Sequence, residues 1–348
     1  MLTLFTTSKP FLGHAGIIQR NALQSWKHLH SEVEVIVFGD EEGVADVCAE
    51  FGLRHEARVE RDPSGLKYIH AMFDRADEIA RYDVLCYVNC DIILGPDFPD
   101  AVQRVRAAHA KFLMVGRRWD TDIVEPIDFS SRLWHEETRA LALKANNQRD
   151  DWWIDYFCFS RDLYYKQIPP FVIGRIRWDN WLIWKALDSH VPVVNASSSV
   201  LAIHQNHNYA YHPEGKVGVW TDELSQRNLS LAGGRRHLRK IADATIRLTP
   251  EGLKPNWARH WHRAKRDLLS ITHAFIFGTW MPAWHFLLGL TRPVRARLGL
   301  RSKPSSQASR GERPLSGHAP FDGLVSSGTL TKGAAESEKP SGARRRSG

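Results

Sequence analysis

The chain has 348 residues, 43% hydrophobic and 25% charged, which is ordinary for a soluble globular protein of one large or two smaller domains. Its formal charge of +8 suggests a nucleic-acid function, but the basic excess lies mainly in the C-terminal third, in stretches such as "RHWHRAKR" and "RPVRARLGLR". Such a basic tail is typical of a solvated or surface-seeking arm, so we expect no specific binding of nucleic acid.

Strand and helix signals alternate through the first half of the chain. At this spacing, alternation predicts right-handed βαβ units, and therefore an α/β fold with a mostly parallel central sheet covered by helices on both faces. In chain order we expect strand 2–7, helix 14–29, strand 33–40, helix 41–52, helix 63–82, strand 83–94, helix 97–110 and strand 111–117.

The second half is less regular. A charged insertion over 117–150 precedes strand 152–160, helix 178–190 and the strands 191–197 and 200–207. The Ser/Gly/Pro/Arg-rich end has no periodic apolar residues and predicts disorder. We therefore divide the chain into a domain over 1–212, a C-terminal helical and basic extension over 213–300, and a disordered tail over 301–348.

Cysteine usage and hydropathy bear on localisation. The four cysteines show no CxxC pairing, which favours buried reduced thiols over a disulfide framework or a zinc site. The first residues, "MLTLFTT", are typical of a strand rather than a signal peptide. The apolar stretch 274–290 is slightly short for a bilayer span and fits a helix lying on a membrane surface or on the protein. We expect a cytoplasmic protein, with peripheral contact to the inner face of the membrane as a further hypothesis.

Several predicted strands end on polar residues. In an open parallel sheet, ligands bind outside the carboxyl ends of the strands. Thr6 and Thr7 end the first strand, Asp40 ends the second, and Asn89 and Asp91 lie near the end of the central one. We expect these side chains to converge on one crevice.

Asp91 is the candidate metal ligand. With Asn89, two residues earlier and expected on the same strand face, it forms a partial shell for Mg²⁺ or Mn²⁺, which leaves positions for phosphate oxygens and water. The alternative is an aspartate that caps a turn before "GPDF". His204 and His207 lie at the end of the last predicted strand of the domain, and either imidazole could complete the shell.

Two residues are candidates for contact with a nucleotide. Asp40 directly follows "VIVFG", where a carboxylate can accept hydrogen bonds from a ribose hydroxyl or a nucleobase, although a simple turn residue is the alternative. "DPSGLKY" is expected to open a helix whose N-terminal amides favour anions. Lys67 in its first turns would add a phosphate-directed charge, and a solvated lysine is the alternative.

Two carboxylates lie among aromatic residues. Asp179 in "RWDNWLIWKA" is expected to cap a helix or to face the crevice as a general base. Asp155 in "WWIDYFCFS" has apolar surroundings that raise the proton affinity of a carboxylate, which suits a base or a hydroxyl-binding group. The nearby aromatic rings are either core or a stacking platform for a sugar acceptor: Trp152, Trp153, Tyr156, Trp178 and Trp181.

As a set, these segments resemble a GT-A-type, family-2-like glycosyltransferase. The resemblance covers roughly residues 1–212 and rests on "LFTT", "VIVFGD", "PSGLKYIHAMFDRA", "WDNWL", "HQNH", and on "VNCDIIL" in the position of the DxD motif. It implies a Rossmann-like GT-A sandwich and the transfer of a sugar from a nucleotide-sugar donor, UDP- or GDP-linked, to a hydroxyl of a carbohydrate or other acceptor. The sequence departs from the motif at Asn89, which stands where the first DxD aspartate is expected.

The resemblance also implies roles for the candidate residues. Thr6, Thr7 and Asp40 would bind the nucleoside, and Lys67 would lie near the diphosphate. Asp91 with Asn89 would hold the Mn²⁺ or Mg²⁺, a C-terminal histidine would join the shell, and Asp179 would be the base. The alternatives are a nucleotidyltransferase of similar fold, for which "TTSKPFLGHAG" is a poor glycine-rich loop, and a non-catalytic module at the membrane periphery.

Overall fold

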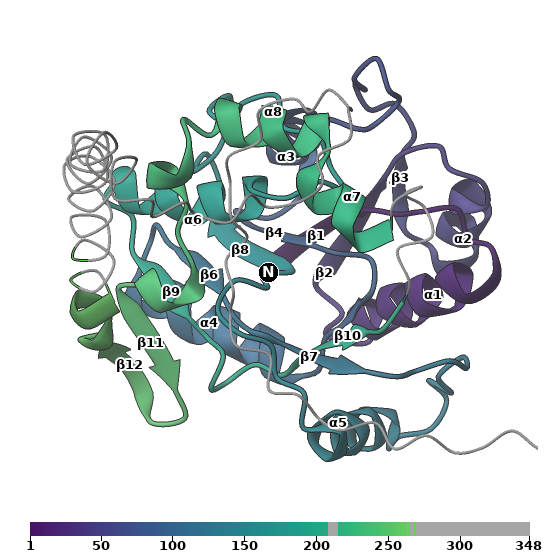
Figure 1. The fold of residues 1–348 in the computed structure, drawn as a ribbon. Coiled ribbons are helices and arrows are strands. Elements are labelled where there is room, and N and C mark those ends of the chain that lie inside the picture. The colour runs from purple at the N-terminus through teal and green to yellow at the C-terminus, as the bar shows by residue number, and fades with distance from the viewer. Residues whose placement is uncertain (208–214, 263, 265–267, 269–348) are drawn as a thin grey trace, which may run out of the picture. The chain divides into compact units, whose positions relative to one another are not determined.

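A nine-stranded sheet forms the centre of the protein in the computed structural model, which describes residues 1–207, 215–262, 264 and 268 (Figure 1). Seven strands run parallel, and only β8 and β12 run against their neighbours. The predicted α/β class with a mostly parallel sheet is confirmed. Across the sheet the order is β12 (Gly252–Pro255), β11 (Ile246–Thr249), β9 (Val193–Asn195), β6 (Leu113–Val115), β8 (Tyr156–Ser160), β4 (Val84–Val88), β1 (Leu2–Thr7), β2 (Val33–Phe38) and β3 (Arg54–Glu56).

Helices cover both faces of this sheet, because successive side chains of a buried strand point to opposite faces. Leu4 of β1 belongs to the core beneath α1 (Gly13–Lys27), α2 (Val44–Phe51) and α4 (Asp97–Ala108). Its neighbour Phe5 belongs to the opposite core, beneath α3 (Ile69–Ile79) and α6 (Trp178–Asp188). There Phe5 packs edge-on against Phe73 at 4.9 Å. The helices α7 (Gly215–Thr221) and α8 (Glu223–Leu231) follow later in the chain.

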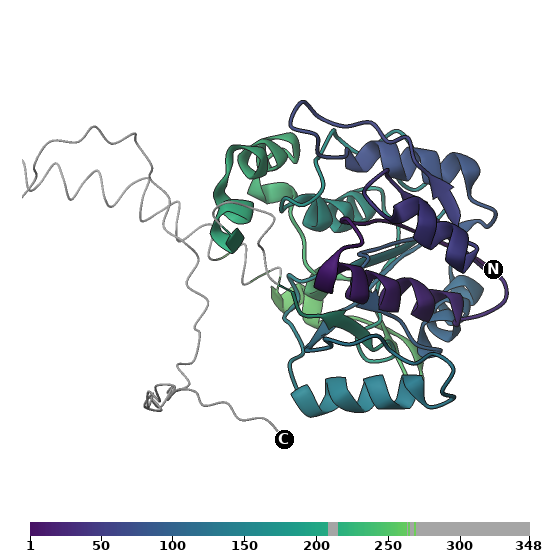
Figure 2. The same ribbon diagram turned by 90° about the vertical axis from the view of Figure 1, so that its right-hand side faces the viewer.

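A second, three-stranded sheet lies beside the first and has the order β5 (Ile92–Ile93), β10 (Ala202–Gln205) and β7 (Arg118–Thr121). The charged insertion expected over 117–150 forms β7 and α5 (Trp134–Ala145), which lie together in the lower part of Figure 1; α5 is the teal helix at the bottom of Figure 2. The apolar side chains of this part pack as a third core that includes Ile93, Trp134 and Ile203.

The strand expected over 83–94 is divided between the two sheets. β4 ends at Val88, a turn closed by a hydrogen bond of 3.1 Å from the Ile92 N–H to the Asn89 carbonyl follows, and β5 continues in the small sheet. Alternation of faces holds only within a continuous strand. The expectation that Asn89 and Asp91 share a strand face is therefore wrong.

The helix expected over 63–82 begins later than predicted. α3 starts at Ile69, and Lys67 lies in the loop before it, so its predicted place in the first turns of the helix is wrong. The cause is local: the Asp62 carboxylate accepts hydrogen bonds from the N–H groups of Ser64 and Leu66, at 3.0 and 2.9 Å, and so closes a turn.

The main sheet continues past residue 212, the domain boundary expected from the sequence, because β11 pairs with β9 in parallel and β12 completes a hairpin. The described residues all belong to one unit, Met1–Met281. The described part of the helical extension expected over 213–300 contains α7 and α8, but also the strands β11 and β12. The apolar stretch 274–290 and the predicted tail over 301–348 lie outside the described residues.

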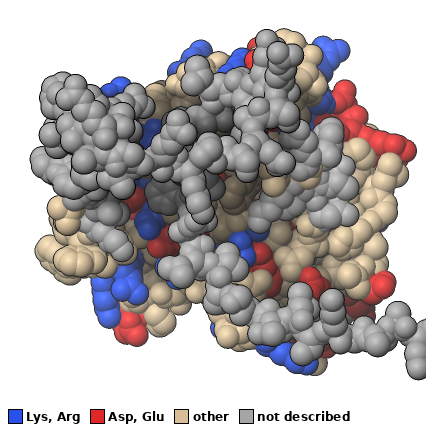
Figure 3. Space-filling view, viewed as in Figure 1, with Lys and Arg blue, Asp and Glu red and all other residues tan. Residues whose placement is uncertain are grey.

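The four cysteines are buried and free, as expected. Among the described residues, no helix is both long and apolar enough to cross a bilayer. In the view of Figure 3, acidic and basic side chains of the described part lie next to one another on the surface.

Candidate active site

The turn between β4 and β5 brings Asp91 to the carboxyl edge of the main sheet. β10 pairs with β5, and His204 is the partner of Ile92, the residue after Asp91. The Gln205 N–H and side-chain amide both donate to the Asp91 carbonyl, at 3.1 and 3.2 Å. This pairing places the histidines of "HQNH" beside the aspartate although more than a hundred residues separate them.

Asp91, His204 and His207 form a cluster in which one ligand atom from each lies within 4.8 Å of the others. The Asp91 Oδ2 atom is 3.1 Å from Nε2 of His207 and 3.7 Å from Nε2 of His204. The other carboxylate oxygen, Oδ1, is buried and has no hydrogen-bond partner among the described residues. A buried carboxylate oxygen without a donor is costly unless something else binds it, and a divalent cation fits this donor set.

Positive charge around Asp91 keeps it ionised. Burial acts to raise its pKa, but His204, His207 and Lys9 act in the opposite direction, and together they hold the pKa well below its usual range. Lys9 lies in the loop after β1 and was not among the predicted site residues. Burial lowers the pKa of Lys9, and Asp91 partly offsets that effect.

Asn89 contacts a different partner from the one predicted. Its side-chain amide donates to Oδ1 of Asp155 at 2.6 Å, and its backbone N–H donates to the Asp155 carbonyl at 2.9 Å. The other Asp155 oxygen forms an ion pair of 2.9 Å with Nη1 of Arg118. Both oxygens of Asp155 are therefore engaged.

The same arginine connects Asp155 to the histidine cluster. Nε of Arg118 is 2.8 Å from Oδ1 of Asp120, and that oxygen is 3.3 Å from Nδ1 of His204. The side chains of Arg118, Asp120 and His204 are almost completely buried. Nδ1 of His204 therefore faces Asp120 and its Nε2 faces Asp91, although the contact with Asp120 does not have hydrogen-bond geometry. A carboxylate in this position is typical of the outer groups that orient metal-binding histidines.

Replacing Arg118 with methionine should lower the free energy of unfolding by about 3–5 kcal/mol, because the buried Asp155 would lose its cation and Asp120 would keep only the more distant Arg149. Denaturant unfolding measures the effect. The matched control is Arg75→Met, which breaks exposed ion pairs with Glu56 and Glu78 and should cost about 1 kcal/mol or less. Equal losses in the two variants would contradict the buried network.

A second group of side chains lies at the ends of β1 and β2. The Lys67 ammonium donates to Oγ1 of Thr7 at 2.6 Å and forms an ion pair with Glu41. The Thr7 hydroxyl in turn donates to the Phe38 carbonyl at 2.9 Å. Burial lowers the pKa of Lys67, and Glu41 partly offsets this. Lys67 is therefore a positioned cation rather than a solvated surface lysine.

Gly39 makes room for this lysine. Its φ of 117° is unfavourable for other residues, and a Cβ atom there would lie 2.5 Å from Cε of Lys67. Asp40, the next residue, is exposed and pairs with Arg61. Thr6 is buried, and its hydroxyl donates to the Thr7 carbonyl at 3.3 Å. The structure thus gathers Thr7, Asp40 and Lys67 into one group, while Thr6 points into the protein.

Asp179 lies in the first turn of α6 rather than at its cap. The cap is Arg177, whose φ of 93° turns the chain into the helix and whose N–H donates to Oδ1 of Asp179 at 3.2 Å. The prediction of Asp179 as the N-cap residue is therefore wrong by two positions. Burial raises the pKa of Asp179 to about 6, against the hydrogen bond from Asn180 and the charge of Arg177, and the negative charge of Asp155 adds to the rise.

The aromatic residues divide between core and surface. Tyr156, Trp178 and Trp181 belong to the hydrophobic cores, whereas Trp152 is exposed. Trp153 lies under the guanidinium groups of Arg118 and Arg149, at 4.8 and 4.5 Å from the ring centre.

Sequence reasoning missed Lys9, Glu41, Arg118 and Asp120. Lys9 and Glu41 follow strands β1 and β2, so the rule that selected Thr7 and Asp40 also applies to them. Arg118 and Asp120 were hidden in the charged insertion. Their spacing of two would have placed them on one face of a strand, had "RWDT" been interpreted as one.

Comparison with known proteins gives structural likeness only. No family model and no curated protein matches the chain. A crystal structure of S. aureus TarS residues 1–349 is 11% identical, with a TM-score of 0.37; the match covers 59% of this chain and only 58% of TarS 1–349. Glucosyl-3-phosphoglycerate synthase from Mycobacterium tuberculosis, solved with Mn²⁺, UDP-glucose and phosphoglyceric acid, is 15% identical, with a TM-score of 0.41; the match covers 67% of this chain and 80% of that one. TarS has also been solved in complex with UDP-GlcNAc.

Proposed function

We propose that the protein is a glycosyltransferase that moves a sugar from a nucleoside diphosphate sugar to an acceptor hydroxyl, with a divalent cation held by Asp91, His204 and His207. The observation that carries the proposal is this cluster at the carboxyl edge of a parallel sheet, where such folds bind ligands. The buried, unpartnered Oδ1 of Asp91 supports a cation there.

The composition of the shell favours Mn²⁺ over Mg²⁺. Asn89 is engaged by Asp155, so two imidazoles and one carboxylate remain as ligands. Mg²⁺ prefers oxygen ligands, whereas imidazole suits first-row transition metals. A bound cation would neutralise negative charge that develops on a departing diphosphate.

The donor would extend from the cation toward the ends of β1 and β2. Lys9, whose charge acts on Asp91, and the buried Lys67 would bind the phosphate oxygens. Thr7 and Asp40 lie at the same strand ends and offer groups for the nucleoside. Glu41 balances the charge of Lys67 while the donor is absent.

Asp179 is the proposed general base. Its raised pKa places it close to neutrality, where a base both remains mostly ionised and accepts a proton from a hydroxyl effectively. Asp155 would position the side chains of Asn89 and Arg118 instead of acting on the acceptor. A single base of this kind is sufficient for transfer with inversion at the anomeric carbon.

The proposal is tested by thermal unfolding of the full chain with UDP, GDP and UDP-glucose, each with Mn²⁺, with Mg²⁺ or without metal. We expect at least one nucleotide to raise the melting temperature with Mn²⁺, and to do so less with Mg²⁺. Release of nucleoside diphosphate from the active donor then identifies turnover. No response to any nucleotide with either metal would contradict the proposal and favour a non-catalytic module.

A further inference from the structure

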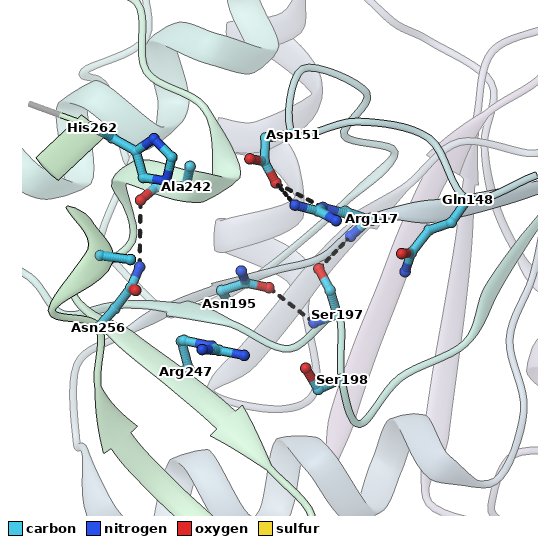
Figure 4. Close-up of a pocket in the computed structure, with 11 residues that line it drawn as sticks. Arg117, Gln148, Asp151, Asn195, Ser197, Ser198, Ala242, Arg247, Asn256 and His262 are labelled. Carbon is cyan, nitrogen blue, oxygen red and sulfur yellow. Dashed lines mark hydrogen bonds and ion pairs between the residues drawn. The ribbon is translucent and has the colours of Figure 1, made fainter. Parts of the chain in front are cut away.

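A cavity of about 300 Å³ opens further along the same edge of the sheet (Figure 4). It lies at the carboxyl ends of β6 and β9 and beside β11. Val115, Asn195 and Arg247 are register partners across these three strands, which brings Asn195 and Arg247 side by side in the lining. None of the residues of the Asp91 cluster lines this cavity.

The charge in this cavity is positive. Arg117 is held by Asp151, whose Oδ1 is 2.7 Å from both Nε and Nη2 of the guanidinium, so this pair is balanced. Arg247 is exposed to the cavity and forms no ion pair with any carboxylate of the described residues. Asn195, Ser198 and His262 add polar groups to the lining, and Figure 4 shows the cavity between these side chains.

Arg117 and Arg118 connect the cavity to the proposed active site. Arg117 lines the cavity, while the next side chain, Arg118, holds Asp155 and Asp120. Arg117 also pairs through its backbone with Ile154, the residue before Asp155. Arg117 in the lining is therefore the chain neighbour of Arg118, which belongs to the network that surrounds Asn89 and Asp155.

We infer that this cavity is the acceptor subsite and that it takes a small hydroxylated molecule carrying a carboxylate or phosphate group. The inference rests on the proposed function. A guanidinium without a carboxylate partner matches such an anion with two parallel hydrogen bonds, and the neighbouring amides and hydroxyl suit the remainder of a polar ligand. The lining contains no aromatic ring apart from His262, so a neutral sugar would have no flat apolar face on which to stack.

The experiment uses the full chain without added metal and three probes: glucose 6-phosphate, glucuronate and glucose. Calorimetric titration should detect binding of at least one anionic probe and no binding of glucose. Tighter binding of glucose 6-phosphate would identify a phosphate site, and tighter binding of glucuronate would identify a carboxylate site. Arg247→Gln should weaken that binding about tenfold or more, equivalent to about 1.4 kcal/mol. The control Lys254→Gln removes the same charge from the same hairpin outside the lining and should leave binding unchanged.

Asp91→Asn separates this site from the metal cluster. Anion binding that persists in Asp91→Asn and weakens in Arg247→Gln supports the inference. The inference is overturned if Asp91→Asn loses anion binding or if Arg247→Gln leaves it unchanged. It is also overturned if glucose binds as tightly as the anionic probes. If the protein binds the anion through Arg247 but binds no nucleotide, the proposed function and the acceptor role are both excluded. The anion site itself would remain.

Discussion

Replacing Asp91 with asparagine should abolish the effect of Mn²⁺ on nucleotide binding and lower the rate of sugar transfer by about 10³-fold, or ~4 kcal/mol. The substitution keeps the shape of the side chain but removes the carboxylate that His204, His207 and Lys9 surround. Thermal unfolding with UDP and Mn²⁺ measures the first effect, and release of nucleoside diphosphate measures the second.

A nearby aspartate provides the control for Asp91. Asp122 is exposed and accepts a hydrogen bond of 2.8 Å from Asn206, but it does not belong to the metal-ligand cluster. Asp122→Asn should therefore retain both the response to Mn²⁺ and the transfer rate. An Asp91→Asn protein with full turnover would exclude this aspartate as a metal ligand, and a loss in both variants would indicate a general effect of removing charge.

Replacing Asp179 with asparagine should lower kcat by about 10²–10⁴-fold while donor binding is retained, because only the acceptor proton loses its base. In the unmodified protein, kcat/KM should fall as the pH drops below about 6, since the base must be ionised and burial raises its pKa to that value. The acidic limb should disappear from the residual activity of the variant. A limb that remains at the same pH would assign the base to another group.

The same substitution should stabilise the fold at neutral pH. The pKa of Asp179 is higher in the folded state than in an unfolded chain, so keeping it ionised at pH 7 costs about 2–3 kcal/mol. Asparagine removes this cost, and the gain should fade as the pH falls toward 4, where the folded wild type is already protonated. Denaturant unfolding of both proteins at pH 7 and pH 4 measures this gain in stability. Glu136→Gln, an exposed acidic residue in the first turn of α5, should change neither activity nor stability appreciably.

Most of the secondary structure followed from local patterns. β1, α1, β2 and α4 lie where apolar periodicity predicted them, and Gly52 ends α2 in a left-handed conformation. The errors occur where a short-range contact overrides the pattern. The Asp62 side chain closes a turn and delays α3, and the turn at residues 89–91 divides a strand whose apolar run continues on both sides.

The sequence by itself determined the alternation of strands and helices, because apolar periodicity and turn residues act over a few neighbours. From that alternation it also predicted that Thr7, Asp40 and Asp91 lie near the carboxyl ends of their strands, at one edge of the sheet. Only the tertiary structure decided which groups face one another there. The pairing of β10 with β5 brings His204 to Asp91, and Arg118 binds Asp155, whose other oxygen holds Asn89. These contacts join residues far apart in the chain, and their geometry depends on strand register and buried charge pairing, which no local pattern encodes.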